Sequence, residues 1–175
     1  LLDYQRKEKV QAMLQRLFGL LIGSAREKPG VVVHRDFHRR NLMLLPDNEL
    51  AVIDFQDAVR GPITYDIVSL LRDCYIRWPG QSVREWALLY RDLLREKGLL
   101  PATDEATFLR WFDWMGLQRH IKVLGTFARL HLRDDKEAYL ADLPLVIDYV
   151  VEVADQYAGQ EAAFAEFSDW FKEQL

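Results

Sequence analysis

The chain has 175 residues, half of them hydrophobic and 29% charged, and its formal net charge is −4. This balance indicates a globular protein with a sizeable core, and we expect a single domain over residues 1–175. The acidic balance argues against nucleic-acid binding, and no apolar run approaches the roughly 18 residues of a membrane span. The single cysteine, Cys74, excludes an intramolecular disulfide and favours a cytoplasmic setting. Because it falls in an apolar helical pattern, we expect an inert core thiol.

The hydrophobic spacing predicts a mostly helical chain around a small β-hairpin platform, an α+β fold. In chain order we expect a helix over 3–22, a loop over 24–30, strands over 31–34, 42–45 and 50–53, and then helices over 64–78, 82–98, 103–132, 143–157 and 161–172. Pro46–Glu49 predicts a hairpin turn between the second and third strands. A capping box over Ser82–Glu85 predicts the start of one helix, and Thr103 the start of the next. We expect the aromatic residues after Thr103 to be core.

Three polar residues lie in the segments that follow the predicted strands. Asp36 and Asn41 lie in one loop with the spacing His-x-Asp-x-x-x-x-Asn, and Asp54 follows the strand that ends at Ile53. Because a hairpin separates the two loops, we expect all three side chains at one end of the platform. Protein kinases have a similar layout, with a His-Arg-Asp loop and a metal-binding Asp-Phe-Gly.

These residue types suit phosphoryl transfer from ATP. Mg²⁺ prefers oxygen ligands from one or two protein groups together with substrate phosphates, and Asn41 and Asp54 could supply them. The acceptor hydroxyl needs a positioned proton acceptor, which Asp36 could provide. A zinc site built on His34, Asp36 and His38 is the alternative. That alternative leaves Asn41 and Asp54 without a role, and the other histidines, His120 and His131, fall in helical patterns.

The stretches HRDFHRRN and AVIDFQDAVRGPITYDIVSLL resemble the aminoglycoside phosphotransferase and choline kinase family, small-molecule kinases with a protein-kinase-like fold. SLLRDCYIRWP, WMGLQRHIKVLGTFARL and YLADLP resemble a bacterial branch that phosphorylates the anomeric hydroxyl of N-acetylmuramate and N-acetylglucosamine in peptidoglycan recycling. The resemblance implies the C-terminal lobe of that fold, ATP as co-substrate and Mg²⁺ as cofactor.

The resemblance also implies site roles. Asp36 would be the catalytic base, and Asn41 and Asp54 would bind Mg²⁺ and the ATP phosphates. Structural or supporting roles would go to His34, His38, Asp57, Arg60 and Asp66. Candidates for sugar recognition are Arg72, Asp73, Arg119 and His120, because polar residues interrupt helices there.

Two departures from the family pattern matter. Gln56 stands where protein kinases have the glycine of Asp-Phe-Gly, so the same activation-loop switch is not expected. No glycine-rich loop or strand lysine precedes residue 30, so we expect the N-terminal nucleotide-gripping lobe to be missing and this piece to be inactive alone. An aminoglycoside or choline-type kinase and a non-catalytic metal- or ligand-binding module remain alternatives.

Overall fold

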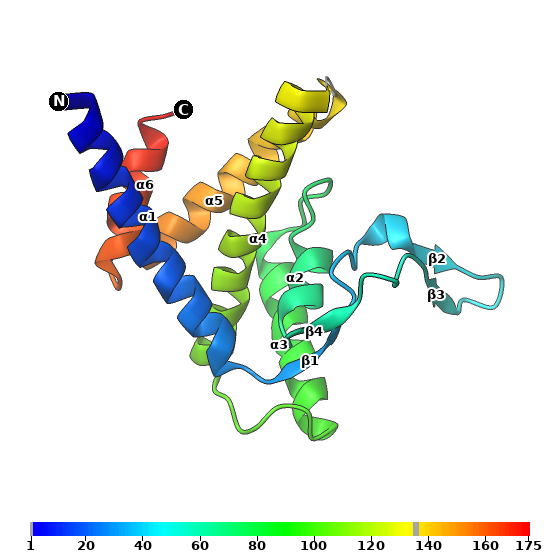
Figure 1. Ribbon diagram of the computed structural model, residues 1–175. Helices are drawn as coiled ribbons and strands as arrows, with labels where there is room; N and C mark the ends of the chain where they lie inside the picture. Colours follow the sequence, from blue (N-terminus) through cyan, green and yellow to red (C-terminus); the bar gives the residue numbers. More distant parts are fainter. Residues whose placement is uncertain (1, 135–136) are drawn as a thin grey trace. The chain divides into compact units, whose positions relative to one another are not determined.

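The computed structural model describes residues 2–134 and 137–175, and the chain divides into two compact units (Figure 1). The platform unit comprises residues 25–116, and the helical unit comprises residues 1–24 and 117–175. The predicted α+β, mostly helical fold class is confirmed at that level, since helices dominate and the sheets are small. The single domain stays a prediction. Within the described residues, no helix has the length and apolarity needed to cross a membrane.

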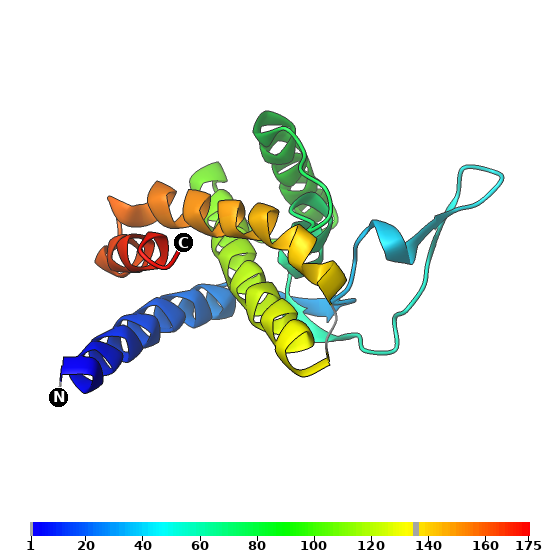
Figure 2. The same ribbon diagram turned by 90° about the horizontal axis from the view of Figure 1, so that it is seen from above.

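The platform unit contains two separate two-stranded antiparallel sheets. β1 (Gly30–Val33) pairs with β4 (Val59–Pro62), and β2 (Leu42–Leu44) pairs with β3 (Leu50–Val52). The predicted hairpin is therefore present as β2–β3. In both views it projects away from α2 and α3, whereas β1 and β4 run close to these helices (Figures 1 and 2).

Strand β4 was not predicted, because Arg60, Gly61 and Pro62 are typical of a loop. Its glycine allows β1 to approach closely: a Cβ at Gly61 would lie only 2.6 Å from Cγ2 of Val33. Val33 is 2% exposed, so it could not move aside without losing core contacts. A residue that weakens an isolated strand thus makes this pairing possible.

The first helix after the sheets, α2 (Tyr65–Leu71), is shorter than predicted, and the expected helix over 64–78 is wrong beyond residue 71. The carboxylate of Asp73 accepts the backbone N–H of Tyr75 at 3.3 Å, a local bond that competes with the helical pattern. Cys74 accordingly lies in this turn and is half-buried, which corrects its expected place in a helical core.

The next two helices begin away from their predicted caps. Helix α3 (Gly80–Glu96) starts directly after Pro79, so the predicted capping box at Ser82 is wrong. Helix α4 (Glu105–Asp134) follows Asp104, whose carboxylate accepts the backbone N–H of Thr107 at 2.8 Å. Asp104, rather than Thr103, therefore satisfies the free amides at this end.

The core of the platform unit lies on the first turns of α4. Phe108, Trp111, Phe112 and Met115 are all at most 6% exposed, which confirms the predicted aromatic core. They pack with buried aliphatic residues of α2 and α3, Val68, Leu71, Val83, Ala87 and Leu94. This packing fixes α2, and with it the turn that follows α2.

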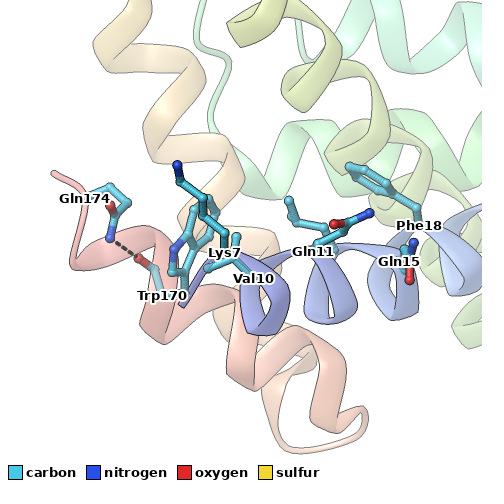
Figure 3. Close-up of a pocket in the computed structure, with 8 residues that line it drawn as sticks. Lys7, Val10, Gln11, Gln15, Phe18, Trp170 and Gln174 are labelled. Atoms are coloured by element: carbon cyan, nitrogen blue, oxygen red, sulfur yellow. Dashed lines mark hydrogen bonds between the residues drawn. The ribbon is translucent and has the colours of Figure 1, made fainter. Parts of the chain in front are cut away.

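The helical unit contains most of α1 (Leu2–Glu27), the later turns of α4, the short 3₁₀ segment η2 (Glu137–Asp142), α5 (Leu143–Ala158) and α6 (Ala162–Lys172). α1 continues through residues 24–27, which were predicted as loop. α5 and α6 pack together, and Asp155 accepts hydrogen bonds from Ser168 and Lys172. A hollow of about 630 Å³ lies between α1 and α6, with Val10 and Trp170 on its walls (Figure 3).

Candidate active site

The loop of residues 34–41, here called the catalytic loop, is fixed at its first end by Asp66. One carboxylate oxygen of Asp66 accepts the backbone N–H of His34 at 2.7 Å, and the other accepts that of Arg35 at 3.0 Å. Arg35 has a φ of 77°, a left-handed conformation that costs free energy for a side chain with a Cβ. Asp66, in the first turn of α2, offsets that cost at the residue before Asp36.

The opposite end of the loop is organised around Asn41. Its side-chain Nδ2 donates to the backbone carbonyl of Asp36 at 2.8 Å and lies 3.5 Å from a carboxylate oxygen of Asp54. Its backbone carbonyl accepts the N–H of Ile53 at 3.1 Å. The side chain of Asn41 therefore links the backbone of Asp36 to the carboxylate of Asp54, and these are the three residues that the sequence singled out.

The segment around Asp54 is tied to the same loop. His34 Nε2 lies 2.9 Å from the carbonyl oxygen of Ile53, directly before Asp54. Asp54 has a φ of 67°, and its second carboxylate oxygen accepts Nε2 of Gln56 at 2.8 Å. Gln56, which departs from the protein-kinase motif, thus orients the carboxylate.

The donor set fits a hard cation such as Mg²⁺. The amide nitrogen of Asn41 is used within the protein, so Oδ1 is the atom of this side chain that would bind a cation, and Asp54 adds an exposed carboxylate. Among the described residues, no group of three or more His, Cys, Asp and Glu side chains is arranged to hold a metal. The zinc alternative gains no support, and His34 Nε2 is already engaged with a backbone carbonyl.

The other supporting residues differ in position. His38 places its ring edge-on to Tyr75, with centroids 6.3 Å apart. Asp57 offers its backbone carbonyl to the Arg35 guanidinium at 3.5 Å, while its side chain is exposed. Arg60 lies in β4 with its side chain over Gly30. Their proposed roles stay predictions.

The four residues predicted to recognise the sugar are spread over both units. In the platform unit, Arg72 forms an ion pair with Asp113 at 2.5 Å, and the buried Asp73 closes the turn after α2. In the helical unit, Arg119 is half-buried, and the buried His120 stacks on Tyr149 with centroids 4.7 Å apart. Their contribution to sugar binding stays a prediction.

Sequence reasoning missed several residues that shape the site. Arg40 lies over the ring of Tyr75, with its Cζ 3.6 Å from the ring centroid. Asp113 is buried in the aromatic stripe of α4, where it pairs with Arg72. The position of this carboxylate between Phe112 and Trp114 could have indicated an ion pair, because a buried charge requires a partner. Nothing in the sequence pattern pointed to Tyr75.

Comparison with known proteins gives relatives with consistent names. The model of the phosphotransferase enzyme family matches residues 1–109. The N-acetylmuramate/N-acetylglucosamine kinase of Neisseria meningitidis serogroup B is 43% identical over 157 residues, 90% of this chain and 47% of that protein. Those of Pseudomonas putida and Pseudomonas aeruginosa are 42% and 45% identical, over 93% and 79% of this chain and 47% and 41% of their own lengths.

The chain spans about half the length of the curated relatives that it matches. The family match covers the catalytic loop, Asp54 and Asp66, so it includes the site described above. The resemblance of the sequence to this group of kinases is thereby confirmed. The chain belongs to the phosphotransferase enzyme family.

Proposed function

We propose that this chain is the acceptor-side lobe of a kinase that transfers the γ-phosphate of ATP to the anomeric hydroxyl of N-acetylmuramate or N-acetylglucosamine. One observation carries the proposal: Asn41 bonds to the Asp36 carbonyl and lies beside the Asp54 carboxylate. The two proposed oxygen ligands, Asn41 and Asp54, are therefore neighbours, and Asn41 is bonded to the backbone of Asp36, the proposed proton acceptor. Phosphoryl transfer requires such a set of groups. The relatives' names support the sugar as acceptor.

Each residue has a distinct task in this proposal. The Asp36 carboxylate orients the sugar hydroxyl and accepts its proton, while Asn41 Oδ1 and Asp54 hold Mg²⁺. Bound Mg²⁺ neutralises charge on the ATP phosphates. Asp66 keeps Asp36 in place by binding the two preceding backbone amides. The bond from Gln56 keeps the Asp54 carboxylate from rotating.

A second lobe, corresponding to the part of the relatives that this chain does not span, would complete the ATP site in our proposal. The relatives support this, because the chain spans about half of their length. We expect the 175-residue chain alone to turn over little ATP, because phosphate positioning supplies much of the rate.

The relatives' names favour an amino sugar over an aminoglycoside or choline as the acceptor. Amino-sugar kinase is therefore the preferred function among the alternatives.

The test uses the full-length protein, meaning this chain together with the lobe that the relatives also have. ADP release is measured with ATP and Mg²⁺ against amino sugars, an aminoglycoside and choline. We expect release with N-acetylmuramate or N-acetylglucosamine and its loss in Asp36→Asn. Turnover only with choline or the aminoglycoside would overturn the substrate, and unchanged turnover in Asp36→Asn would overturn the role of Asp36.

A further inference from the structure

We propose that Tyr75 is a positioning residue that holds the Asn41 end of the catalytic loop through Arg40. This inference rests on the proposed function, because it concerns how the metal ligand Asn41 is kept in place. Tyr75 belongs to the turn after α2, a segment whose sequence pointed to roles for Arg72 and Asp73 but to none for Tyr75. All the contacts that carry the inference lie within the platform unit.

The turn that contains Tyr75 is attached to α4 through Arg72. Arg72, at the end of α2, pairs with Asp113 at 2.5 Å and lies over the ring of Phe112 at 5.0 Å. A Cβ at Gly116 would come within 3.3 Å of the Arg72 guanidinium, so this glycine leaves room for the pair. The Asp73 carboxylate then accepts the backbone N–H of Tyr75. The turn that contains Tyr75 is thus attached to α4 through Arg72, and the Tyr75 backbone is bonded to Asp73 within that turn.

The Tyr75 ring contacts the catalytic loop on two sides. The Arg40 guanidinium lies over its face at 3.6 Å from the centroid, a cation–π distance. The ring of His38 meets it edge-on, with an interplanar angle of 89°. Arg40 directly precedes Asn41, and the backbone N–H of Asn41 bonds to the carbonyl of His38 at 2.9 Å. Tyr75 therefore restrains the two residues that fix the backbone of Asn41.

One residue at the start of α2 and one after its end therefore hold the two ends of the catalytic loop. Asp66, at the start of α2, holds the end near Asp36 through two hydrogen bonds. Tyr75, after the end of α2, holds the end near Asn41. Loss of the Tyr75 ring should loosen the metal ligand and leave the proton acceptor in place. The effect should appear in the Mg²⁺ requirement and not in the pH dependence of turnover.

The test compares Tyr75→Leu, Tyr75→Phe and Arg40→Met in the full-length protein. Arg40 is exposed, and a cation–π contact at an exposed site corresponds to a roughly two- to fivefold change in an equilibrium constant. We expect Tyr75→Leu to raise the Mg²⁺ concentration for half-maximal activity by that factor, with the acid limb of the kcat–pH profile unchanged. Tyr75→Phe keeps the aromatic face and should stay close to wild type. Arg40→Met should match Tyr75→Leu, and the double variant should be no worse than either.

The matched control is Trp78→Leu, which removes an aromatic ring from the same segment. Trp78 packs edge-on against Trp86, and we expect no change in the Mg²⁺ requirement. Additive effects of Tyr75→Leu and Arg40→Met, or equal effects of the Leu and Phe variants, would overturn the inference. So would a lowered melting temperature with an unchanged Mg²⁺ requirement. Absence of any sugar phosphorylation by the wild type would overturn the proposed function as well, so the two failures are distinguishable.

Discussion

The buried lysine Lys28 makes the stability of the platform unit depend on pH in an unusual direction. Its side chain is packed against Trp111, whose backbone carbonyl accepts Nζ at 2.9 Å, and Nζ lies 3.5 Å from the Thr64 hydroxyl. Burial, and secondarily the charge of Arg110, lowers the pKa of Lys28 from 10.5 to about 7. The charge of Glu27 raises the pKa of Lys28, but by less than burial and Arg110 lower it.

The sign of the effect follows from where the proton binds. Between pH 7 and 10.5 the unfolded chain holds a proton on Lys28 that the folded chain has lost, so the free energy of unfolding rises with pH. Below pH 7 both states are protonated, and the folded state carries the full cost of a buried charge. Over two pH units within this window, the Lys28 contribution should change by about 2 to 3 kcal/mol.

The measurement is urea unfolding of the chain and of its Lys28→Met variant, at pH values from 6 to about 9.5. The variant cannot titrate at this position, so the free energy of unfolding of the wild type should increase relative to that of the variant by about 3 kcal/mol over this pH range. Lys122→Met removes an exposed lysine and serves as the control, which should run parallel to wild type. Parallel curves for wild type and Lys28→Met would refute the reasoning, because they would show that Lys28 does not lose its proton on folding.

Three further substitutions test the roles of Asp36, Asp66 and Arg72, and a fourth experiment measures the activity of the 175-residue chain alone. Asp36→Asn should lower kcat of the full-length protein by roughly 10²- to 10⁴-fold, with an unchanged melting temperature. Asp66→Ala removes the acceptor of two loop amides and should lower both kcat and the melting temperature, whereas an effect on stability alone would contradict its role at the loop. Arg72→Met removes the ion pair of the buried Asp113 with Arg72, and should cost about 3–5 kcal/mol in urea unfolding; adding Asp113→Leu should recover part of that loss. The 175-residue chain alone should release ADP at background rates. Robust turnover would contradict the proposal that a second lobe is needed to complete the ATP site.

Features with strong local signals could be predicted from the sequence. The β2–β3 hairpin followed from two apolar runs around Pro46–Glu49, and the core of α4 from its aromatic spacing. The closeness of Asn41 to Asp54 also followed, because a hairpin returns the chain to its starting end. These predictions succeeded because neighbours in sequence determine them.

Features that depend on distant partners could not be predicted. Strand β4 forms because Gly61 fits against Val33, a match between residues far apart in the chain. Helix α2 ends early because Asp73 bonds to the Tyr75 backbone, although the apolar pattern continues. The stacking of Arg40 on Tyr75 is likewise visible only once the fold is known.

We propose above all that the loop around Asp36 directs phosphate to a sugar hydroxyl. The most direct measurement is ³¹P NMR of the full-length protein incubated with ATP, Mg²⁺ and N-acetylmuramate or N-acetylglucosamine. The account predicts a sugar 1-phosphate formed in step with ADP, and its loss in Asp36→Asn. ADP without a phosphorylated sugar, or phosphate on a hydroxyl other than the anomeric one, would contradict it.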